Sequence, residues 1–250
     1  SALWFGAQPG HMVAVTGTNG KTSVATFTRQ LWMALGHAAI NIGTTGVEGA
    51  WEAPSAHTTP DPITLHAMLA DAAAAGVTHA AMEASSHGLD QRRMDGVRLR
   101  AAGFTNLTQD HLDYHHTMEE YFRAKAGLFD RLLPEDATAV INMHGAGGAD
   151  VLAIAEERGR KALTVGRTMG CNLRITGQRY DATGQDLRFD WQGQPHQVHL
   201  NLVGGFQAEN VLVAAGLVIA AGEAASDVFR VLPSLTGGRG RLQLAAPRQN

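Results

Sequence analysis

The sequence predicts an α/β protein with a doubly wound, mainly parallel sheet, a phosphate-binding P-loop and a small antiparallel β meander. Three observations support this fold class. Strand-like and helix-like patterns alternate along most of the 250 residues, a rhythm typical of parallel sheets. A glycine-bounded loop joins the first expected strand to a helix. Between residues 173 and 202 polar and apolar residues alternate, as they do in antiparallel strands.

In the first half of the chain, short apolar runs are expected to form strands and longer amphipathic runs to form helices. Gly36 and Gly76 are suited to end helices, and Pro62 is suited to the first turn of one. The expected elements are a strand at 12–16, a helix at 22–35, a strand at 39–43, a helix at 62–75, and strands at 77–83 and 101–105.

The second half continues this alternation on both sides of the meander. Gly184 and Gly193 bound runs of alternating polarity at 187–191 and 198–202, so an antiparallel subregion is expected within residues 171–203. The other expected elements are a helix at 118–131, a strand at 137–142, a helix at 151–158, a strand at 162–165, and helices at 208–221 and 225–232.

Composition excludes several classes of protein. Apolar residues make up 44% of the chain, and the net charge of −3 without a basic run argues against nucleic acid as a partner. No apolar run approaches the ~18 residues of a membrane span. The single cysteine, Cys171, allows neither an internal disulfide nor a four-cysteine zinc site, which fits a cytoplasmic protein.

The segment Gly-Thr-Asn-Gly-Lys-Thr at 17–22 has the chemistry of a polyphosphate-binding loop. Its glycines let backbone N–H groups face phosphates, the following helix N-terminus adds partial positive charge, and the lysine neutralises the outer phosphates. The threonine hydroxyl can reach a Mg²⁺ ion between two phosphates. Val15 stands where the standard pattern has a glycine, so this is a shorter variant that begins at Gly17. The competing interpretation is an ordinary tight turn before a helix.

Polar side chains follow two further expected strands. Glu83 ends one strand ahead of Ser-Ser-His at 85–87, and Asn106 ends another ahead of a histidine-rich stretch. Parallel α/β sheets bind ligands at the carboxyl ends of their strands. Glu83 is therefore a candidate Mg²⁺ ligand beside the P-loop.

Other chemistry is less favoured at these positions. His111 and the histidines at 115 and 116 have a spacing that allows zinc, but no second cluster or cysteine supports it. A nucleophilic serine at 85–86 is disfavoured, because adjacent residues on an extended segment point to opposite faces and no Gly-x-Ser-x-Gly elbow is present. Lys125 falls on an amphipathic helix, where most lysines are solvated.

Six motifs occur in a defined order along the chain. They are Gly-Thr-Asn-Gly-Lys-Thr at 17–22, His-Thr-Thr-Pro-Asp-Pro at 57–62, Ala-Met-Glu-Ala-Ser-Ser-His-Gly-Leu at 81–89, Phe-Thr-Asn-Leu at 104–107, Asp-His-Leu-Asp-Tyr-His at 110–115 and Ala-Lys at 124–125. Together they resemble the Mur ligases, most closely the members that add a diamino acid to UDP-N-acetylmuramoyl-L-alanyl-D-glutamate. The resemblance covers residues 1–250 but only the family's central ATP-binding domain, and it implies that the N-terminal and C-terminal domains are absent.

The resemblance implies an ATP-dependent ligase of peptidoglycan precursor synthesis in the bacterial cytoplasm. Such a ligase phosphorylates a carboxylate of the UDP-muramoyl dipeptide and lets the amine of an amino acid displace the phosphate. Meso-diaminopimelate is the preferred amino acid, although the domain that distinguishes it from lysine is absent. The implied ligands are ATP, Mg²⁺, the UDP-muramoyl dipeptide and the amino acid. A monomer without nucleic acid or a membrane span is expected.

The resemblance also assigns roles to individual residues. In the family the lysine matching Lys125 is carbamylated, which turns an ammonium into an oxygen ligand. The implied catalytic residues are Lys21, Glu83, His111 and Lys125, and the implied metal ligands are Thr22, Glu83, His111 and Lys125 as its carbamate. The implied ATP-binding residues are Gly17, Thr18, Asn19, Gly20, Lys21, Thr22, Ser23, Asn210 and Arg241. The implied substrate-binding residues are Thr58, Thr59, Ser85, Gln91 and Arg93.

The sequence departs from the family pattern in two places. Gln207 stands where the family often has asparagine near the adenine, and His144-Gly145 replaces a usual acidic pair. Two alternatives stay open. One is a ligase resembling folylpolyglutamate synthetase, whose loop usually continues Gly-Lys-Gly-Ser. The other is an isolated nucleotide-binding module without ligase activity.

Overall fold

A computed structural model describes residues 1–110 and 112–237 of the chain. In this part, ten strands form one sheet in the order β10-β9-β8-β7-β6-β5-β1-β4-β2-β3. Neighbouring strands are parallel from β2 across the sheet to β8, whereas β3 at one edge and β9 and β10 at the other are antiparallel. The strands are β1 (His11–Thr16), β2 (Ala39–Gly43), β3 (Gly46–Gly49), β4 (His79–Glu83), β5 (Leu99–Phe104), β6 (Thr138–Asn142), β7 (Lys161–Gly166), β8 (Leu173–Tyr180), β9 (Gln185–Trp191) and β10 (Gln194–Leu200).

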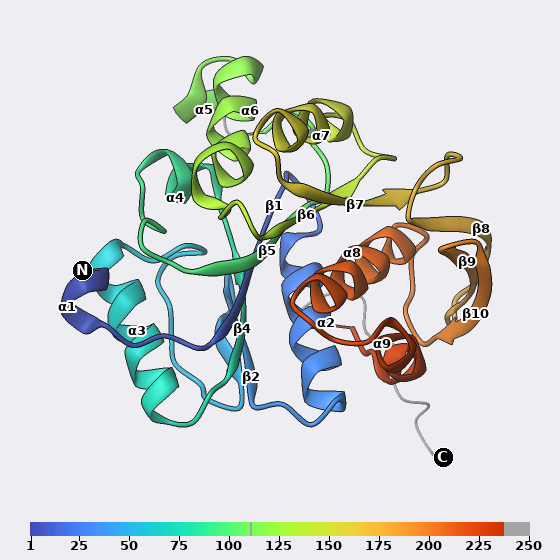
Figure 1. Ribbon diagram of the computed structural model, residues 1–250, viewed down its shortest axis with the longest axis horizontal. Coiled ribbons are helices and arrows are strands. Elements are labelled where there is room, and N and C mark those ends of the chain that lie inside the picture. The colour runs from blue at the N-terminus through green and yellow to red at the C-terminus, as the bar shows by residue number, and fades with distance from the viewer. Residues whose placement is uncertain (111, 238–250) are drawn as a thin grey trace.

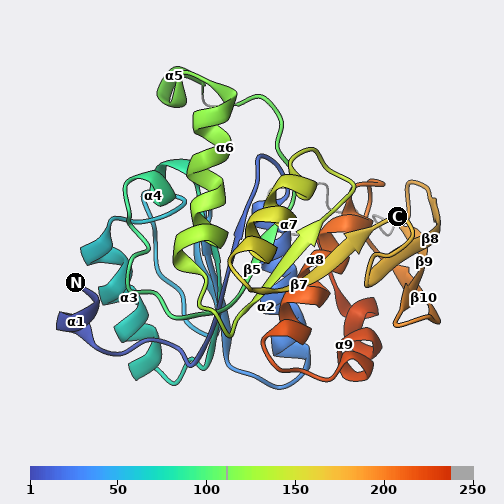
Figure 2. The same ribbon diagram turned by 45° about the horizontal axis from the view of Figure 1, so that its top comes forward.

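Helices cover both faces of the sheet, as Figure 1 and the turned view of Figure 2 show. The helices are α1 (Ala2–Phe5), α2 (Lys21–Ala34), α3 (Pro62–Ala74), α4 (Ser86–Asp90), α5 (Leu112–His115), α6 (Met118–Gly127), α7 (Gly148–Glu157), α8 (Gln207–Ala220) and α9 (Ala225–Val231), with a π-helical turn η1 (Leu128–Leu132) and a 3₁₀ turn η2 (Leu232–Ser234). None of the helices in the described part of the chain is both long and apolar enough to cross a bilayer.

The central strand β1 shows why the sheet is covered on both sides. Its side chains alternate between faces, so Val13 and Val15 pack in one apolar cluster and Met12 and Ala14 in the other. The first cluster is completed by α2, α8 and α9, and the second by α3, α7 and η1. A strand that is buried on both faces has a continuous run of apolar residues in its sequence, and residues 12–15 form such a run.

The predicted fold class is confirmed, and most of the expected elements lie within a few residues of their expected bounds. Unexpected elements are the edge strand β3 and the short helices α1, α4 and α5. The expected helix at 118–131 instead changes to π-helical geometry after Gly127. The antiparallel region is not a separate layer, because β8 pairs with β7 and extends the main sheet.

The topology places the P-loop at a switch point of the sheet. The chain leaves β1 toward β2 on one side and later returns to place β5 on the other side of β1. In open α/β sheets the space above the carboxyl ends of the strands at such a point is the usual ligand site. The loops after β1, β4 and β5 therefore meet at this edge.

Candidate active site

The P-loop after β1 has a backbone that requires its two glycines. Gly17 has φ 144° and Gly20 has φ 89°, both in the region that favours glycine. A side chain at Gly17 would collide with Thr105 Oγ1, and a Cβ at Gly20 would lie 2.5 Å from Asn210 Oδ1. The loop is held against the segment that follows β5, because Thr18 N donates to Asn106 O at 2.8 Å. The interpretation of residues 17–22 as an ordinary turn does not explain this close fit.

Lys21 begins α2, and its ammonium lies over the loop. Its Nζ donates to Gly17 O at 2.9 Å and to Thr18 O at 2.8 Å. This position puts a positive charge beside the N-terminus of a 14-residue helix, whose own dipole also favours anions. The arrangement suits the outer phosphates of a nucleotide.

Glu83, the last residue of β4, is 1% exposed and is surrounded by hydroxyl and amide donors. Thr22 Oγ1 donates to Glu83 Oε2 at 3.0 Å, and Thr44 N donates to Glu83 Oε1 at 3.0 Å. The absence of a side chain at Gly43 makes room for the carboxylate, which a Cβ there would meet. Ser86 Oγ is buried nearby without a hydrogen-bond partner among the described residues. These oxygen groups fit Mg²⁺, which prefers carboxylate and hydroxyl oxygens.

Lys125 is buried rather than solvated, contrary to the expectation for a lysine on an amphipathic helix. It is 1% exposed, its Nζ donates to Gly17 O at 2.9 Å, and it lies 4.3 Å from the centre of the Tyr121 ring. Burial, reinforced by the nearby Lys21 ammonium, lowers the pKa of Lys125 to about 7. Lys125 lies on the side of α6 that packs against the P-loop, and the pattern of polar and apolar residues along α6 does not reveal this packing.

Two adjoining cavities follow from these contacts. The smaller, of about 210 Å³, is lined by Thr18, Asn19, Gly20, Lys21, Thr22, Thr44, Thr58, Glu83, Ser85, Ser86 and Lys125. The larger, of about 830 Å³, is lined by Asn19, Gly20, Ser23, Asn106, Asn142, His144, Gly145, Arg167, Gln178, Tyr180, Gly205, Phe206, Glu209 and Asn210. Asn19 and Gly20 line both, so the P-loop separates a small charged site from a wider site with aromatic walls.

The residues expected to bind a substrate divide into two groups. Thr58 and Ser85 line the smaller cavity. Thr59 is buried, and its hydroxyl donates to Glu83 O and accepts from Ser85 N, so it positions the loop after β4. Arg93 donates to Thr59 O at 2.8 Å and to Gln91 Oε1 at 2.9 Å.

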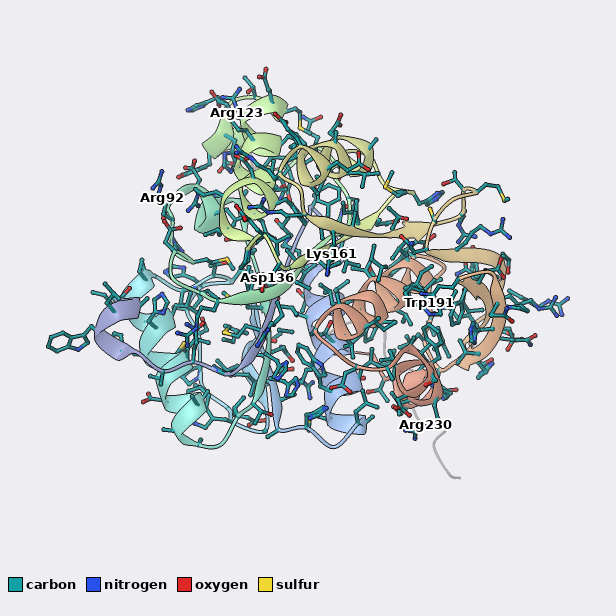
Figure 3. All side chains as sticks on the ribbon, in the orientation of Figure 1. Arg92, Arg123, Asp136, Lys161, Trp191 and Arg230 are labelled. Carbon is teal, nitrogen blue, oxygen red and sulfur yellow. The ribbon has the colours of Figure 1, made fainter. Side chains whose placement is uncertain are left out.

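Ser85 does not lie on an extended run into residue 86, which corrects that step of the sequence argument. It is the N-cap of α4, and its Oγ accepts from Gly88 N at 3.0 Å. The capping role explains the Ser-x-x-Gly spacing and gives no sign of a nucleophile. Beyond α4 a further cavity of about 600 Å³ includes Arg92 and Arg123, which project outward in Figure 3.

Two residues of the expected site, His111 and Arg241, lie outside the described residues. Of the neighbouring histidines, His115 is buried against the rings of His87 and Tyr121, and His116 is exposed. The described part of the chain thus brings Lys21, Thr22, Glu83 and Lys125 together around one cavity.

Sequence reasoning missed two residues at this site, Thr44 and Ser86. Thr44 contacts Glu83. It directly follows the expected strand at 39–43, and this position at the carboxyl end of a strand could have identified it as a site residue. Ser86 faces the cavity because α4 begins there. Gln207 does not line the larger cavity, and its Oε1 instead accepts from Asn210 Nδ2 at 3.2 Å. Gln207, which departs from the family pattern, therefore orients the side chain of Asn210.

Comparisons with known proteins agree on one family. Residues 15–218 match the Mur ligase middle domain. The chain is 50% identical over 251 residues to the UDP-N-acetylmuramoyl-L-alanyl-D-glutamate–2,6-diaminopimelate ligase of Agrobacterium fabrum, covering 100% of this chain and 51% of that protein. It is 50% identical over 250 residues to the ligase of the same name from Caulobacter vibrioides, covering 97% and 51%. The chain therefore spans about half the length of these curated relatives.

Solved structures give the same picture of the fold. A structure of a UDP-N-acetylmuramoyl-L-alanyl-D-glutamate–2,6-diaminopimelate ligase is similar with a TM-score of 0.85 and 32% identity, covering 98% of this chain and 50% of that one. Folylpolyglutamate synthase from Mycobacterium tuberculosis, complexed with ADP, is similar with a TM-score of 0.72 and 20% identity, covering 94% and 60%. At that lower identity the likeness concerns the fold alone.

Proposed function

This chain belongs to the Mur ligase family, and on that premise we propose that it is the ATP-binding core of a MurE-type ligase. The proposed reaction joins a diamino acid, meso-diaminopimelate, to UDP-N-acetylmuramoyl-L-alanyl-D-glutamate at the expense of ATP. One observation carries the proposal: Lys21, Glu83 and Lys125, from three separate elements, surround one small cavity beside the P-loop. The names of the relatives support the choice of substrates.

The proposed nucleotide site uses both cavities. The triphosphate lies over the loop at 17–22, where backbone N–H groups, the start of α2 and the Lys21 ammonium provide positive potential. The nucleoside extends into the larger cavity, where Asn210 provides an amide and Tyr180 and Phe206 provide aromatic surface. Arg241 is proposed near the γ-phosphate on the family match alone.

The proposed metal ligands are Thr22, Glu83, His111 and a carbamate of Lys125. The Thr22 hydroxyl already contacts the Glu83 carboxylate at 3.0 Å, which supports a shared Mg²⁺ ion. When bound, Mg²⁺ offsets negative charge on the phosphates during transfer. A carbamate on Lys125 would be anionic beside Lys21, because both amines donate to Gly17 O at 2.9 Å.

The proposed chemistry has two steps. A substrate carboxylate oxygen attacks the γ-phosphorus, and the bond from that phosphorus to the β–γ bridging oxygen breaks. ADP departs, and the substrate becomes an acyl phosphate. The amine then attacks the acyl carbon, loses a proton and expels inorganic phosphate as the amide forms. Lys21 holds the transferring group, while Thr58, Ser85, Gln91 and Arg93 are proposed to hold the dipeptide so that the reacting atoms stay in line.

Calorimetry with Mg-ATP tests the nucleotide site in the 250-residue chain. We expect Mg²⁺-dependent binding that is lost in Lys21→Ala and retained in Lys161→Ala, since Lys161 is exposed on β7. Circular dichroism shows whether each variant is folded. A folded chain that binds no ATP, or equal binding by the two variants, would refute the proposed site.

A turnover assay separates a ligase from a nucleotide-binding module. The assay uses a longer protein, in which this chain is joined to the other half of the length that its curated relatives have. ATP hydrolysis by that longer protein should depend on the UDP-muramoyl dipeptide and on the diamino acid, and a folate acceptor should not replace them. The isolated chain should bind ATP but turn it over poorly, because acyl phosphate formation needs the acceptor held in place. A monomeric state and a bacterial cytoplasmic location stay predictions.

A further inference from the structure

Histidines gather at the edge of the sheet opposite the P-loop. His11 and His79 begin β1 and β4 and are paired in register. His37 lies in the turn after α2, and Glu223 lies between α8 and α9. Four segments that are distant in sequence therefore bring three imidazoles and one carboxylate to the amino-terminal ends of the strands, the lower edge in Figure 1.

Three of these residues are close enough to share one ion. A ligand atom from each of His37, His79 and Glu223 lies within 4.8 Å of the other two. His37 Nε2 is 2.7 Å from Glu223 Oε1, and the centres of the His37 and His79 rings are 4.1 Å apart. Tetrahedral zinc with bonds of about 2.0–2.1 Å places its ligand atoms about 3.4 Å apart. The His37 and His79 rings are inclined by 30°, so metal binding would require side-chain rotations that turn a nitrogen of each ring toward the same point.

We propose that His37, His79 and Glu223 bind a divalent transition metal ion, with zinc as the best match. Two imidazoles and one carboxylate are a ligand set that zinc accepts in proteins, with water in the fourth position. Mg²⁺ is a poor match, because it prefers oxygen ligands and octahedral geometry. The site is separate from Glu83 and the P-loop, so the inference does not depend on the proposed ligase function.

The surroundings orient the His79 ring and fix the backbone of His37 before any metal binds. Thr78 Oγ1 contacts His79 Nδ1 at 2.8 Å, which orients the ring and makes Nε2 the nitrogen available to a metal. The His11 ring stacks on His79 with centres 4.4 Å apart, and His11 Nδ1 lies 3.4 Å from Ala221 O. The backbone of His37 is tied to α2 by its bond to Trp32 O at 3.0 Å.

Binding would add a metal cross-link between segments that already pack through the buried cluster of α2, α8 and α9. Glu223 follows Gly222 in the loop between α8 and α9, and a metal would clamp that loop to β4 and to the end of α2. We therefore expect zinc to raise the thermal stability of the chain. It should do so without nucleotide, since the site lies at the other end of the strands.

The test uses the chelator-treated 250-residue chain with zinc and with cobalt as separate probes. Calorimetry should find a saturable zinc site, and cobalt should give the visible absorption of a tetrahedral complex. His37→Gln and Glu223→Gln, which replace partly exposed side chains, should each weaken zinc binding by more than about tenfold and remove the cobalt band. His79→Gln should do the same, but it alters a buried ring, so the other two variants decide.

His199→Gln is the matched control. His199 and Asp186 also form a histidine–carboxylate pair at 2.8 Å, but it is exposed on the meander and outside the proposed cluster. This variant should bind zinc like the unsubstituted chain. The proposal is overturned by the absence of saturable zinc binding at micromolar concentrations, or by unchanged binding in His37→Gln and Glu223→Gln. Loss of the cobalt band in Glu83→Gln but not in His37→Gln would overturn it too, by placing the metal at the P-loop edge.

Discussion

Lys125 is expected to react with carbon dioxide under conditions in which an ordinary lysine does not. The neutral amine is the form that attacks CO₂ to give a carbamate. With its pKa lowered to about 7 by burial and by Lys21, about 90% of the Lys125 amine is neutral at pH 8. A solvated lysine with a pKa of about 10.4 is only about 0.4% neutral there. The buried amine should therefore offer about 200-fold more reactive free base.

The chain suits a direct assay because it has only three lysines, at 21, 125 and 161. We would add ¹³C-bicarbonate, Mg²⁺ and a non-hydrolysable ATP analogue at pH 8 and record ¹³C NMR spectra. A carbamate signal should be present in the unsubstituted chain and in Lys161→Met, and absent in Lys125→Met. A signal from the N-terminal amine would persist in all three. Identical spectra from the unsubstituted chain and Lys125→Met would refute the reasoning. In the longer enzyme, formate should restore part of the activity that Lys125→Ala loses.

Three further predictions follow from contacts at the same edge of the sheet. Gly43→Ala should destabilise the chain by about 1–3 kcal/mol in urea unfolding, because the new Cβ meets the Glu83 carboxylate; an unchanged midpoint would contradict this. Asp61→Ala should cost about 1 kcal/mol, because Asp61 caps α3 by accepting from Ile63 N and Thr64 N. A side-chain hydrogen bond with Thr64, together with these backbone bonds, lowers the pKa of Asp61 below 3.8. The cost should therefore be full above that pH and disappear as the pH falls through the lowered value; a cost independent of pH would argue against the cap. Arg93→Ala in the longer enzyme should raise the Michaelis constant for the UDP-muramoyl dipeptide about tenfold and leave that for ATP nearly unchanged; equal effects on both would exclude a role in acceptor binding.

Periodicity and loop chemistry were sufficient to predict the fold class and the edge of the sheet at which the candidate site residues gather. The apolar run before Gly17 could only be a buried strand, and Glu83 had to lie at the carboxyl end of a parallel neighbour. The register confirms this, since Val15 pairs with Glu83. Short elements were not predictable, because α4 has only five residues and depends on the cap at Ser85.

Sequence reasoning could not predict which individual side chains are buried or which partners they contact. Nothing local distinguishes Lys125 from a solvated lysine, because its ammonium is buried against the P-loop, where it donates to Gly17 O. Gln207 likewise had no predictable partner until α8 placed it one helical turn before Asn210. A tertiary contact with the P-loop decides the role of Lys125, whereas Gln207 and Asn210 meet within one helix.

The same geometry explains why proposed sites lie at both ends of one strand. Side chains at 79, 81 and 83 of β4 share a face, so His79 and Glu83 lie on the same side of the sheet, about 13 Å apart along the strand. Helix α2 packs over that face and spans about 21 Å. Its start therefore brings Thr22 to Glu83, and the turn after its end brings His37 to His79. A single strand–helix pair thus positions the proposed phosphate site at one edge and the proposed zinc site at the other.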